Sequence, residues 1–513
     1  MNISKTNHGI FTLLCVILTG VALTSGCGSG EEISKSDFPA NIVETTNGPV
    51  RGLTVDEQVH VFKGVRYGAP PVGALRFKPP TRPAPWTEPA VAYEYGNRAM
   101  QGSGLSEGSD NLPGISEDCL FLNVWTPGLD DKKRPVMVWL HGGGFSAGSG
   151  SDSFCDGKNL ARKGDVVVIT INHRLNVFGF LQLSEAWGPD YTSSGQAGML
   201  DIVMSLEWVR DNVALFGGDP GNVTIFGESG GGRKVAMMMA MKPAAGLFHK
   251  AIIQSGSGLD APSKADSVAL GRELLQNLGI ADGDIDALVS TGARAFLDAQ
   301  PSTPRSPGAP PGQLTLPVGG FVPCVDGIAL ERKPFIPDAP MISAGIPLMI
   351  GSNKDEMAIF RSSNPEFGTQ TEEEFVAYVR EVLPDKADVM IQALHSAFPD
   401  YSPSDLIVAT DTIKGYWVAT VLQAERKAAQ GAAPVYVYQL AWETRSDNGR
   451  LRAHHALDVP LVFDNVENTR SMVGPGPETW PAYNMKTRAT MVFDIVSHVV
   501  QDPYQEIRRI LLQ

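Results

Sequence analysis

Short apolar stretches recur along this chain, and their spacing constrains its fold more than any other feature. They occupy residues 135–140, 165–172, 222–227, 249–254, 346–351 and 435–440. Segments whose apolar residues follow helical spacing lie between several of them, most clearly residues 197–216. Strands covered on both faces are continuous apolar runs, and their alternation with helices is typical of parallel sheets. The sequence therefore predicts an α/β fold with a central, mostly parallel sheet flanked by helices.

The segments outside this series indicate one domain with insertions. Residues 41–67 have the pattern of short strands joined by turns, with Asn47-Gly48 as a hairpin signal. The proline-rich residues 69–86 have the pattern of irregular chain. Residues 263–321 are less regular and rich in proline and serine in their later part, so we expect an inserted cap or loop over the sheet. Although 513 residues would allow about three domains by length alone, we expect a single domain over residues 41–513.

The N-terminus has the order of a secretory signal. Lys5 precedes an uncharged apolar run at residues 9–23, and small residues lead into Cys27. The Thr-Ser-Gly-Cys ending resembles a bacterial lipoprotein cleavage site, although such sites prefer an aliphatic residue in place of the threonine. We predict a signal peptide at residues 1–26, a flexible tether at 27–40, and export with a possible lipid anchor at Cys27. Plain secretion without an anchor stays open.

Net charge and cysteine content exclude several classes of partner and site. A net charge of −14 argues against nucleic acids and anionic membrane surfaces, which need basic patches. Three cysteines lie beyond the leader, at Cys119, Cys155 and Cys324, without metal-ligand spacing. We expect small buried residues, with a disulfide between two of them as the alternative.

Residues 227–231, Gly-Glu-Ser-Gly-Gly, fit the nucleophile elbow, with Ser229 at its centre. This turn holds a serine in a strained conformation between a strand and a helix, and flanking glycines avoid side-chain clashes there. The pattern alone is weak in a chain with 54 glycines. Its context is right, because residues 223–226 are typical of a strand and residues 234–241 of a helix. The elbow predicts nucleophilic catalysis by Ser229.

A second glycine cluster could stabilise the oxyanion of acyl transfer. Gly142, Gly143 and Gly144 directly follow a predicted strand, where they can present backbone N–H groups to a ligand. The N–H of Gly230, next after the nucleophile, would complete the cradle. A glycine turn without a role is the alternative, but two such motifs at the ends of separate strands disfavour it.

The base must be a histidine late in the chain, and the acid must lie between serine and histidine. Of the nine histidines, His454 and His455 are best placed, on a loop after the last apolar run. Asp355 and Glu356 both follow the preceding run. Spacing alone does not decide between His454 and His455, or between Asp355 and Glu356.

These motifs together resemble the type-B carboxylesterase family, which includes cholinesterases and bacterial para-nitrobenzyl esterases. The likeness runs from about residue 43 to residue 508. Three further stretches carry it, with the sequences FKGVRYGAPP at residues 62–71, SEDCLFLNV at 116–124 and FGGDP at 216–220.

The resemblance implies the α/β-hydrolase fold and no cofactor or metal. It implies Ser229 as nucleophile, Glu356 as acid and, as the histidine before Ala-Leu-Asp, His455 as base. It makes Gly143, Gly144 and Gly230 the oxyanion donors, and it matches Ser255 to a serine often found close to the acid.

Three departures from the family pattern bear on the site. The family usually has alanine where Gly230 stands, but glycine keeps the N–H donor. Many members pair the equivalent of Cys119 with an upstream cysteine, a position that Ala99 holds here, which weakens a disulfide. Residues 473–480 are short where relatives commonly carry an additional helix, so we expect a less covered site.

The function expected is hydrolysis of small-molecule carboxylic esters through a covalent acyl-enzyme. Cleavage of carbamates, amides or thioesters by the same residues is the first alternative, because the choice of leaving group depends on pocket shape. A catalytically silent adhesion or binding protein is the second. Such family members lack triad residues, and all three are present here.

Overall fold

The computed structural model describes residues 40–56, 58–102, 112–301, 320–474 and 502–512. The predicted signal peptide, nearly all of the tether, and Cys27 lie outside these residues. So does most of the shortened stretch at residues 473–480. None of the described helices is long and apolar enough to cross a membrane.

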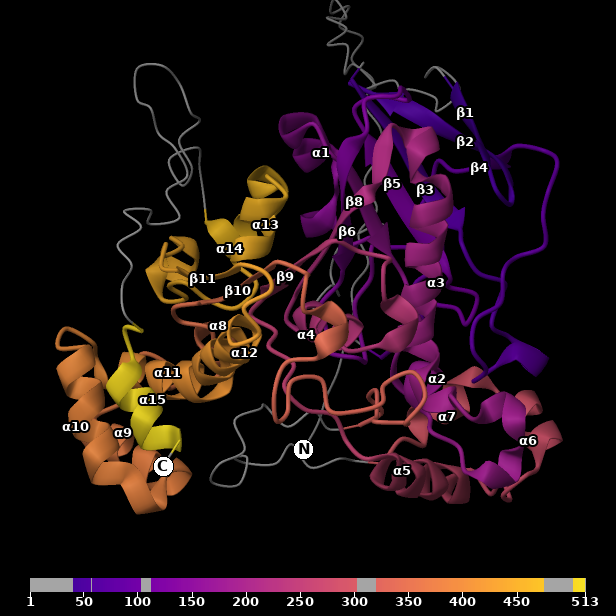
Figure 1. Ribbon diagram of the computed structural model, residues 1–513. Helices are drawn as coiled ribbons and strands as arrows, with labels where there is room; N and C mark the ends of the chain where they lie inside the picture. Colours follow the sequence, from indigo (N-terminus) through magenta and orange to yellow (C-terminus); the bar gives the residue numbers. More distant parts are fainter. Residues whose placement is uncertain (1–39, 57, 103–111, 302–319, 475–501, 513) are drawn as a thin grey trace, which may run out of the picture. The chain divides into compact units, whose positions relative to one another are not determined.

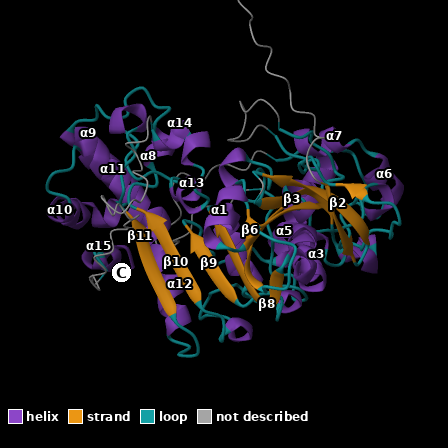
Figure 2. Ribbon diagram, turned by 90° about the horizontal axis from the view of Figure 1, so that it is seen from above, coloured by secondary structure: helices purple, strands orange, loops and turns teal. Residues whose placement is uncertain are grey.

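The described strands form one mixed sheet in the order β1-β2-β3-β5-β7-β6-β8-β9-β10-β11, with β4 paired to β2. Figure 2 shows the successive strands side by side, with helices on both sides of the sheet. Their bounds are β1 Ala40–Thr45, β2 Gly48–Val55, β3 Val59–Arg66, β4 Ala90–Val91, β5 Phe121–Thr126, β6 Arg134–Leu140, β7 Val167–Ile171, β8 Gly218–Glu228, β9 Lys250–Gln254, β10 Leu348–Asn353 and β11 Val435–Leu440.

The six strands predicted from the apolar runs are present, and they form the parallel part of the sheet, from β7 to β11. All five residues of β7 are buried, as a strand covered on both faces requires. The carboxyl ends of β6, β8 and β10 lead directly into the glycine turn, the elbow and the predicted acid. The parallel register therefore brings these three segments to one edge of the sheet.

The N-terminal part of the sheet is antiparallel, so the sheet is mixed, although most of its strand pairs are parallel as predicted. β1 and β2 form the predicted hairpin, in which Thr45 pairs with Gly48. Antiparallel pairing continues through β3 and β5 to β7. The hairpins β1-β2 and β2-β3 need only short connections, which is why residues 40–66 lack the alternating helices that signalled the rest.

The helices bounding the sheet and its insertions are α1 Lys158–Gly164, α2 Asn176–Phe180, α3 Ala197–Asn212, α4 Gly230–Met238, α5 Lys264–Asn277, α6 Ile285–Ser290, α7 Ala293–Asp298, α8 Ala358–Arg361, α9 Glu372–Val382, α10 Ala387–Ala397, α11 Pro403–Thr412, α12 Val418–Ala428, α13 Asp458–Val462, α14 Arg470–Val473 and α15 Gln505–Leu512. A π-helical turn at Ile413–Trp417 joins α11 to α12. The predicted helix at 197–216 is α3, which tightens into a 3-10 turn at Val213–Phe216. The helix after the elbow begins at Gly230, four residues before the predicted start.

The insertion expected at residues 263–321, as a cap or loop, is helical in its first part, where α5, α6 and α7 lie. Two caps mark these helices in the sequence. The Ser263 side chain accepts a hydrogen bond from the backbone N of Asp266, and Asp284 does the same from Ala287. The later, proline- and serine-rich part lies largely outside the described residues.

A second helical group, α9 to α12 with α15, surrounds its own apolar cluster, which includes Phe375, Leu406, Trp417 and Ile507. In Figure 1 the yellow α15 lies among the orange α9, α10 and α11, although the chain between them is long. This group also supplies the π-helical turn that reaches the site described below.

Cys119, Cys155 and Cys324 are all free and buried. Burial raises the pKa of Cys324 to about 11, so its thiol stays protonated at neutral pH. The prediction of small buried residues is confirmed, and the disulfide alternative was wrong.

Candidate active site

Ser229 occupies a strained turn between β8 and α4. Its backbone has φ 56° and ψ −119°, a region that a residue with a side chain rarely adopts. The Ser229 N–H donates to Gln254 O of β9 at 2.8 Å, which fixes the turn against the sheet. The serine is partly exposed, whereas both neighbours are buried. The turn therefore presents the hydroxyl at the end of the sheet, as a nucleophile elbow requires.

The flanking glycines are needed for close packing of this turn. A Cβ at Gly227 would lie 2.6 Å from Leu140 O, and a Cβ at Gly231 would overlap the same carbonyl. The end of β6 and the segment that carries the added side chain would have to move apart to admit it. The steric reason given from the sequence therefore holds at both positions.

The structure brings His455 and Glu356 together. His455 Nδ1 lies 2.6 Å from Glu356 Oε2, and the His455 N–H donates to the backbone carbonyl of Glu356 at 3.2 Å. Glu356 is fully buried, and its Oε1 accepts from the backbone N of Asn353 at 2.7 Å. The carboxylate is thus held at both oxygens and orients the imidazole.

The neighbouring candidates point elsewhere. His454 Nδ1 lies 2.6 Å from His455 O, and its Nε2 lies 3.2 Å from Met472 O, so neither ring nitrogen faces the acid. Asp355 accepts from Tyr401 Oη at 3.3 Å and from the Ala453 N–H at 3.4 Å. The geometry therefore separates both pairs that spacing left open.

His455 Nε2 lies 3.1 Å from Oε1 of Glu228, the residue just before the nucleophile. Among the described residues, Ser229 Oγ makes no hydrogen bond, and His455 Nε2 faces Glu228 instead of the serine. Hydrogen bonds of catalytic groups are often loose without substrate.

Three buried carboxyl groups surround this imidazole, on Glu228, Glu356 and Asp458. Burial lowers the pKa of His455, but the charges of Glu228 and Glu356 outweigh burial and raise it to about 9. Burial raises the pKa of Glu228 to about 8 and also raises that of Asp458. Asp458 is held by Gln254 Nε2 at 2.7 Å. These carboxylate charges therefore stabilise the protonated form of the His455 imidazole.

Of the three predicted oxyanion donors, Gly143 and Gly144 lie in the turn after β6, and Gly230 is the first residue of α4. Gly143 and Gly144 have φ values of 79° and 65°, which favour glycine, and Gly143 O accepts from the Ala147 N–H at 3.1 Å. A Cβ at Gly230 would overlap the backbone of Gly144. The glycine turn and the start of α4 thus pack backbone against backbone beside Ser229.

A buried lysine holds the start of the glycine turn through a hydrogen bond. Lys234 of α4 is fully buried, and its Nζ donates to His141 O at 2.8 Å. The rings of His141 and His173 stack beside it, with centroids 4.9 Å apart. Burial lowers the pKa of Lys234 to about 7. The hydrogen bond fixes the point where β6 enters the turn.

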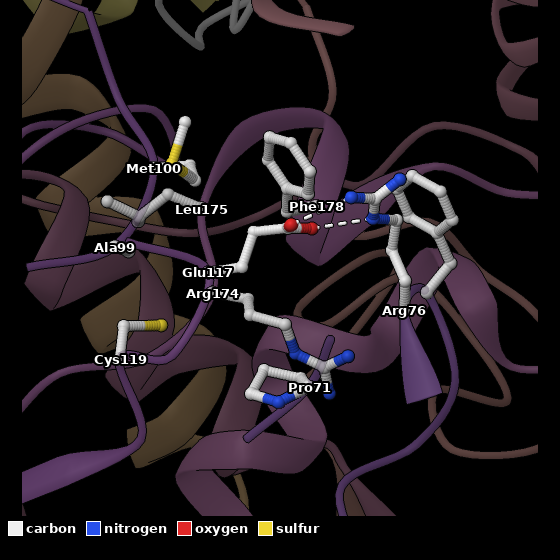
Figure 3. A pocket seen from close by; sticks show the side chains of 10 residues that line it. Pro71, Arg76, Ala99, Met100, Glu117, Cys119, Arg174, Leu175 and Phe178 are labelled. Atoms are coloured by element: carbon white, nitrogen blue, oxygen red, sulfur yellow. Dashed lines mark hydrogen bonds and ion pairs between the residues drawn. The ribbon is translucent and has the colours of Figure 1, made fainter. Parts of the chain in front are cut away.

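A separate, narrow recess is drawn in Figure 3. In it Arg76 Nε lies 2.6 Å from Glu117 Oε1, and Arg174 is engaged by Asp201. Its lining consists of Pro71, Arg76, Phe77, Ala99, Met100, Glu117, Cys119, Arg174, Leu175 and Phe178. Because Ser229 and His455 do not line it and its charges are paired, we assign it no part in catalysis.

Sequence reasoning assigned Ser255 a supporting place, and it missed several neighbours of the triad. Ser255 Oγ is buried without a hydrogen-bond partner in the described part of the chain. Tyr416 of the π-helical turn lies with its ring centroid 5.2 Å from that of His455, and Phe360 lies at 5.1 Å. Glu228 could have been found from its place beside Ser229. No sequence signal marks Tyr416 or Phe360.

The described residues contain no group of three or more His, Cys, Asp or Glu side chains arranged to hold a metal ion.

Known proteins share both the sequence and the fold. The carboxylesterase family model matches residues 39–486. Para-nitrobenzyl esterase of Bacillus subtilis (strain 168) is 35% identical over 497 residues, covering 91% of this chain and 98% of that protein. Fumonisin B1 esterase of Sphingopyxis macrogoltabida is 33% identical over 445 residues, covering 84% and 76%.

Among solved structures, a carboxylesterase of Geobacillus stearothermophilus at pH 6.2 superposes with a TM-score of 0.71 and 37% identity, covering 85% of this chain and 87% of that one. A para-nitrobenzyl esterase structure gives a TM-score of 0.70 and 34% identity, with 85% and 86% covered. The family match, these relatives and the shared architecture show that this chain belongs to the carboxylesterase family and is a carboxylic ester hydrolase of the α/β-hydrolase fold.

Proposed function

We propose that the chain cleaves small-molecule carboxylic esters through a covalent acyl-enzyme on Ser229, with His455 as base and Glu356 as its orienting acid. The observation that carries the proposal is the buried 2.6 Å contact between His455 and Glu356, next to a serine held at φ 56°. A strained serine and an oriented imidazole are the two parts that nucleophilic catalysis needs.

The reaction follows from this arrangement. His455 Nε2 turns from Glu228 to accept the Ser229 proton as Oγ attacks the ester carbonyl. The N–H groups of Gly143, Gly144 and Gly230 donate to the resulting oxyanion, each worth about 3 kcal/mol in comparable sites. The imidazolium then protonates the leaving alkoxide, which departs as the alcohol. Water, deprotonated by His455, releases the acid and restores Ser229.

The leaving group is the open part of the proposal. The relatives are named for different molecules, among them fumonisin B1 and phenmedipham. We favour esters because the match to the para-nitrobenzyl esterase covers nearly its whole length. Comparing purified protein on nitrophenyl esters, a nitroanilide and a nitrophenyl carbamate tests this. Faster turnover of the anilide or carbamate would reject the ester assignment.

Burst kinetics test the acyl-enzyme. The parent should release a burst of nitrophenol equal to the enzyme concentration when deacylation is slow. Ser229→Ala should stay folded and lose the burst, whereas Ser255→Ala should keep it. A burst that survives in Ser229→Ala would reject the nucleophile.

We also propose that the protein is exported and anchored by a lipid on Cys27. The support is the leader pattern alone, from Lys5 through the apolar run to Cys27. Cys27→Ser should release the protein from the membrane fraction or block its processing. An unmodified mature chain starting near Gly28 in mass spectrometry would show plain secretion instead.

A further inference from the structure

Lys234 contacts the glycine turn at both of its ends. The turn, residues 142–144, lies between His141 and Phe145. Lys234 Nζ donates to His141 O at 2.8 Å, and it lies 5.9 Å from the centroid of the Phe145 ring, within the range of a cation–π contact. A single amino group therefore contacts both ends of the segment that carries two of the proposed oxyanion donors.

The same lysine belongs to the helix that carries the third donor. Gly230 is the first residue of α4 and Lys234 follows four positions later, so both lie on one face of the helix. That face packs on the turn, because a Cβ at Gly230 would overlap the backbone of Gly144. The hydrogen bond from Lys234 to His141 O therefore joins the two segments whose spacing decides where the three N–H groups meet.

The amino group of Lys234 is costly to bury. The side chain is fully buried, and burial lowers its pKa to about 7. Removing an amino group from water in this way costs free energy of folding. An unbranched apolar side chain such as methionine would fill nearly the same space without that cost. Filling the core therefore does not explain the amino group, whereas a fixed hydrogen bond to the turn does.

The residues at both ends of the turn are also held from the other side. The His141 ring stacks on that of His173, with centroids 4.9 Å apart, and the Asn176 N–H donates to Phe145 O at 2.7 Å. These contacts come from the segment after β7 and leave the distance to α4 free. Lys234 supplies the contact that fixes the turn against α4, and its bond to a backbone carbonyl means that it acts through the turn.

We propose that Lys234 is a positioning residue of the oxyanion hole, whose hydrogen bond to His141 O fixes the spacing between the N–H groups of the glycine turn and that of Gly230. Oxyanion donors stabilise the transition state only when they are aimed at the oxygen that becomes charged. A displacement of ~1 Å can cost ~10²-fold in rate. The inference rests on the proposed acyl transfer at Ser229 and adds to it a residue that sets the rate without touching the substrate.

The test removes the amino group and compares catalysis with the binding of a transition-state mimic. Lys234→Met keeps nearly the length of the side chain and loses the donor. Lys427→Met is the matched control, because Lys427 of α12 is also buried and its Nζ donates to Ala344 O at 2.6 Å and to Gln430 Oε1 at 2.9 Å, which belong to neither the turn nor α4. The mimic is an aryl trifluoromethyl ketone, to which a serine adds to form a tetrahedral oxyanion.

Lys234→Met should fold and lose at least about tenfold in kcat on a nitrophenyl ester, with KM changed less than about threefold, because the donors act on the transition state. The inhibition constant of the trifluoromethyl ketone should rise by the same factor as kcat/KM falls. A purely structural role would lower the amount of active enzyme and leave that constant unchanged. Lys427→Met should keep both kcat and the inhibition constant.

An unchanged inhibition constant in Lys234→Met, or an equal rise in Lys427→Met, would overturn the inference. If Lys234→Met does not fold, Lys234→Gln takes its place, since its amide donor is one bond shorter and reaches His141 O only if the turn moves. An unchanged inhibition constant in Lys234→Gln would likewise overturn the inference. A parent that neither hydrolyses the ester nor binds the trifluoromethyl ketone would instead reject the proposed acyl transfer at Ser229.

Discussion

Replacing Glu356 with glutamine should disable the base while leaving the fold intact. Glu356 Oε1 accepts from the backbone N of Asn353, so the oxygen of a glutamine amide must stay on that side. The amide nitrogen then faces His455 Nδ1, where Oε2 was 2.6 Å away. An N–H donor there forces Nδ1 to act as the acceptor and places the ring proton on Nε2. In that tautomer Nε2 cannot take the proton of Ser229.

The size of the loss in kcat depends on the acidic groups that remain near His455 after the substitution. Exchange of a triad acid for its amide costs about 10⁴-fold in kcat in a serine protease, or about 5 kcal/mol at 1.36 kcal/mol per factor of ten. Here Glu228 Oε1 still lies 3.1 Å from Nε2, and its carboxylate, ionised above the raised pKa of about 8, can partly stabilise the imidazolium. We therefore expect a loss of roughly 10³-fold in kcat, with little change in KM.

The assay is steady-state hydrolysis of a nitrophenyl ester, with a thermal melt to verify folding. Asp355→Asn is the matched control, since Asp355 contacts Tyr401 and Ala453 but not His455. It should keep a kcat near that of the parent. A larger loss for Asp355→Asn than for Glu356→Gln would show that the assignment is shifted by one residue.

Three other predictions follow from the site. Because the base must be neutral and its pKa is raised to about 9, kcat/KM should increase as pH rises from 7 toward 9, and a profile that is already flat at pH 7 would contradict this. Gly230→Ala should lower kcat at least tenfold, since its Cβ would overlap Gly144; unchanged kinetics would show that the glycine turn moves freely. Burial lowers the pKa of Lys234 from 10.5 to about 7, so the unfolded chain binds this proton more tightly than the folded chain does. The free-energy cost of burying the charged lysine is therefore complete below pH 7 and is lost as the pH rises toward 10.5. In denaturant titrations the parent should therefore gain roughly 1 kcal/mol per pH unit over Lys234→Met between pH 7 and about 9, and a pH-independent difference would refute the buried charge.

The parts of the site that depend on local sequence could be predicted. The elbow at Ser229 needs a strand, a tight turn and a helix within a few residues, and the glycines on either side have a steric cause visible in the motif. The parallel strands could be predicted equally well, because a buried parallel strand is apolar along its whole length. Their order in the sheet came only from the structure.

Choices between adjacent residues could not be made from spacing. His454 and His455 differ by one position, and their rings point to Met472 and Glu356 respectively. Only the family resemblance selected His455, and the geometry agrees. Tyr416 was missed because its contact with His455 depends on how a distant helical group packs against the sheet.

The helices at residues 264–298 were missed for another reason. Their caps at Ser263 and Asp284 were present in the sequence, but the apolar faces are narrow, and the proline-rich stretch beyond them favoured irregular chain. Much of α5 faces solvent, so few of its residues had to be apolar. Tertiary packing, more than periodicity, stabilises such short helices.

Covalent labelling tests the central assignment most directly. A fluorophosphonate phosphorylates an activated serine with loss of fluoride, and peptide mass spectrometry locates the adduct. We predict one adduct per chain, on the peptide that contains Ser229, with labelling strongly slowed in His455→Ala and unaffected in His454→Ala. An adduct on any other residue, or equal labelling of Ser229→Ala and the parent, would contradict the assignment of Ser229 as the nucleophile.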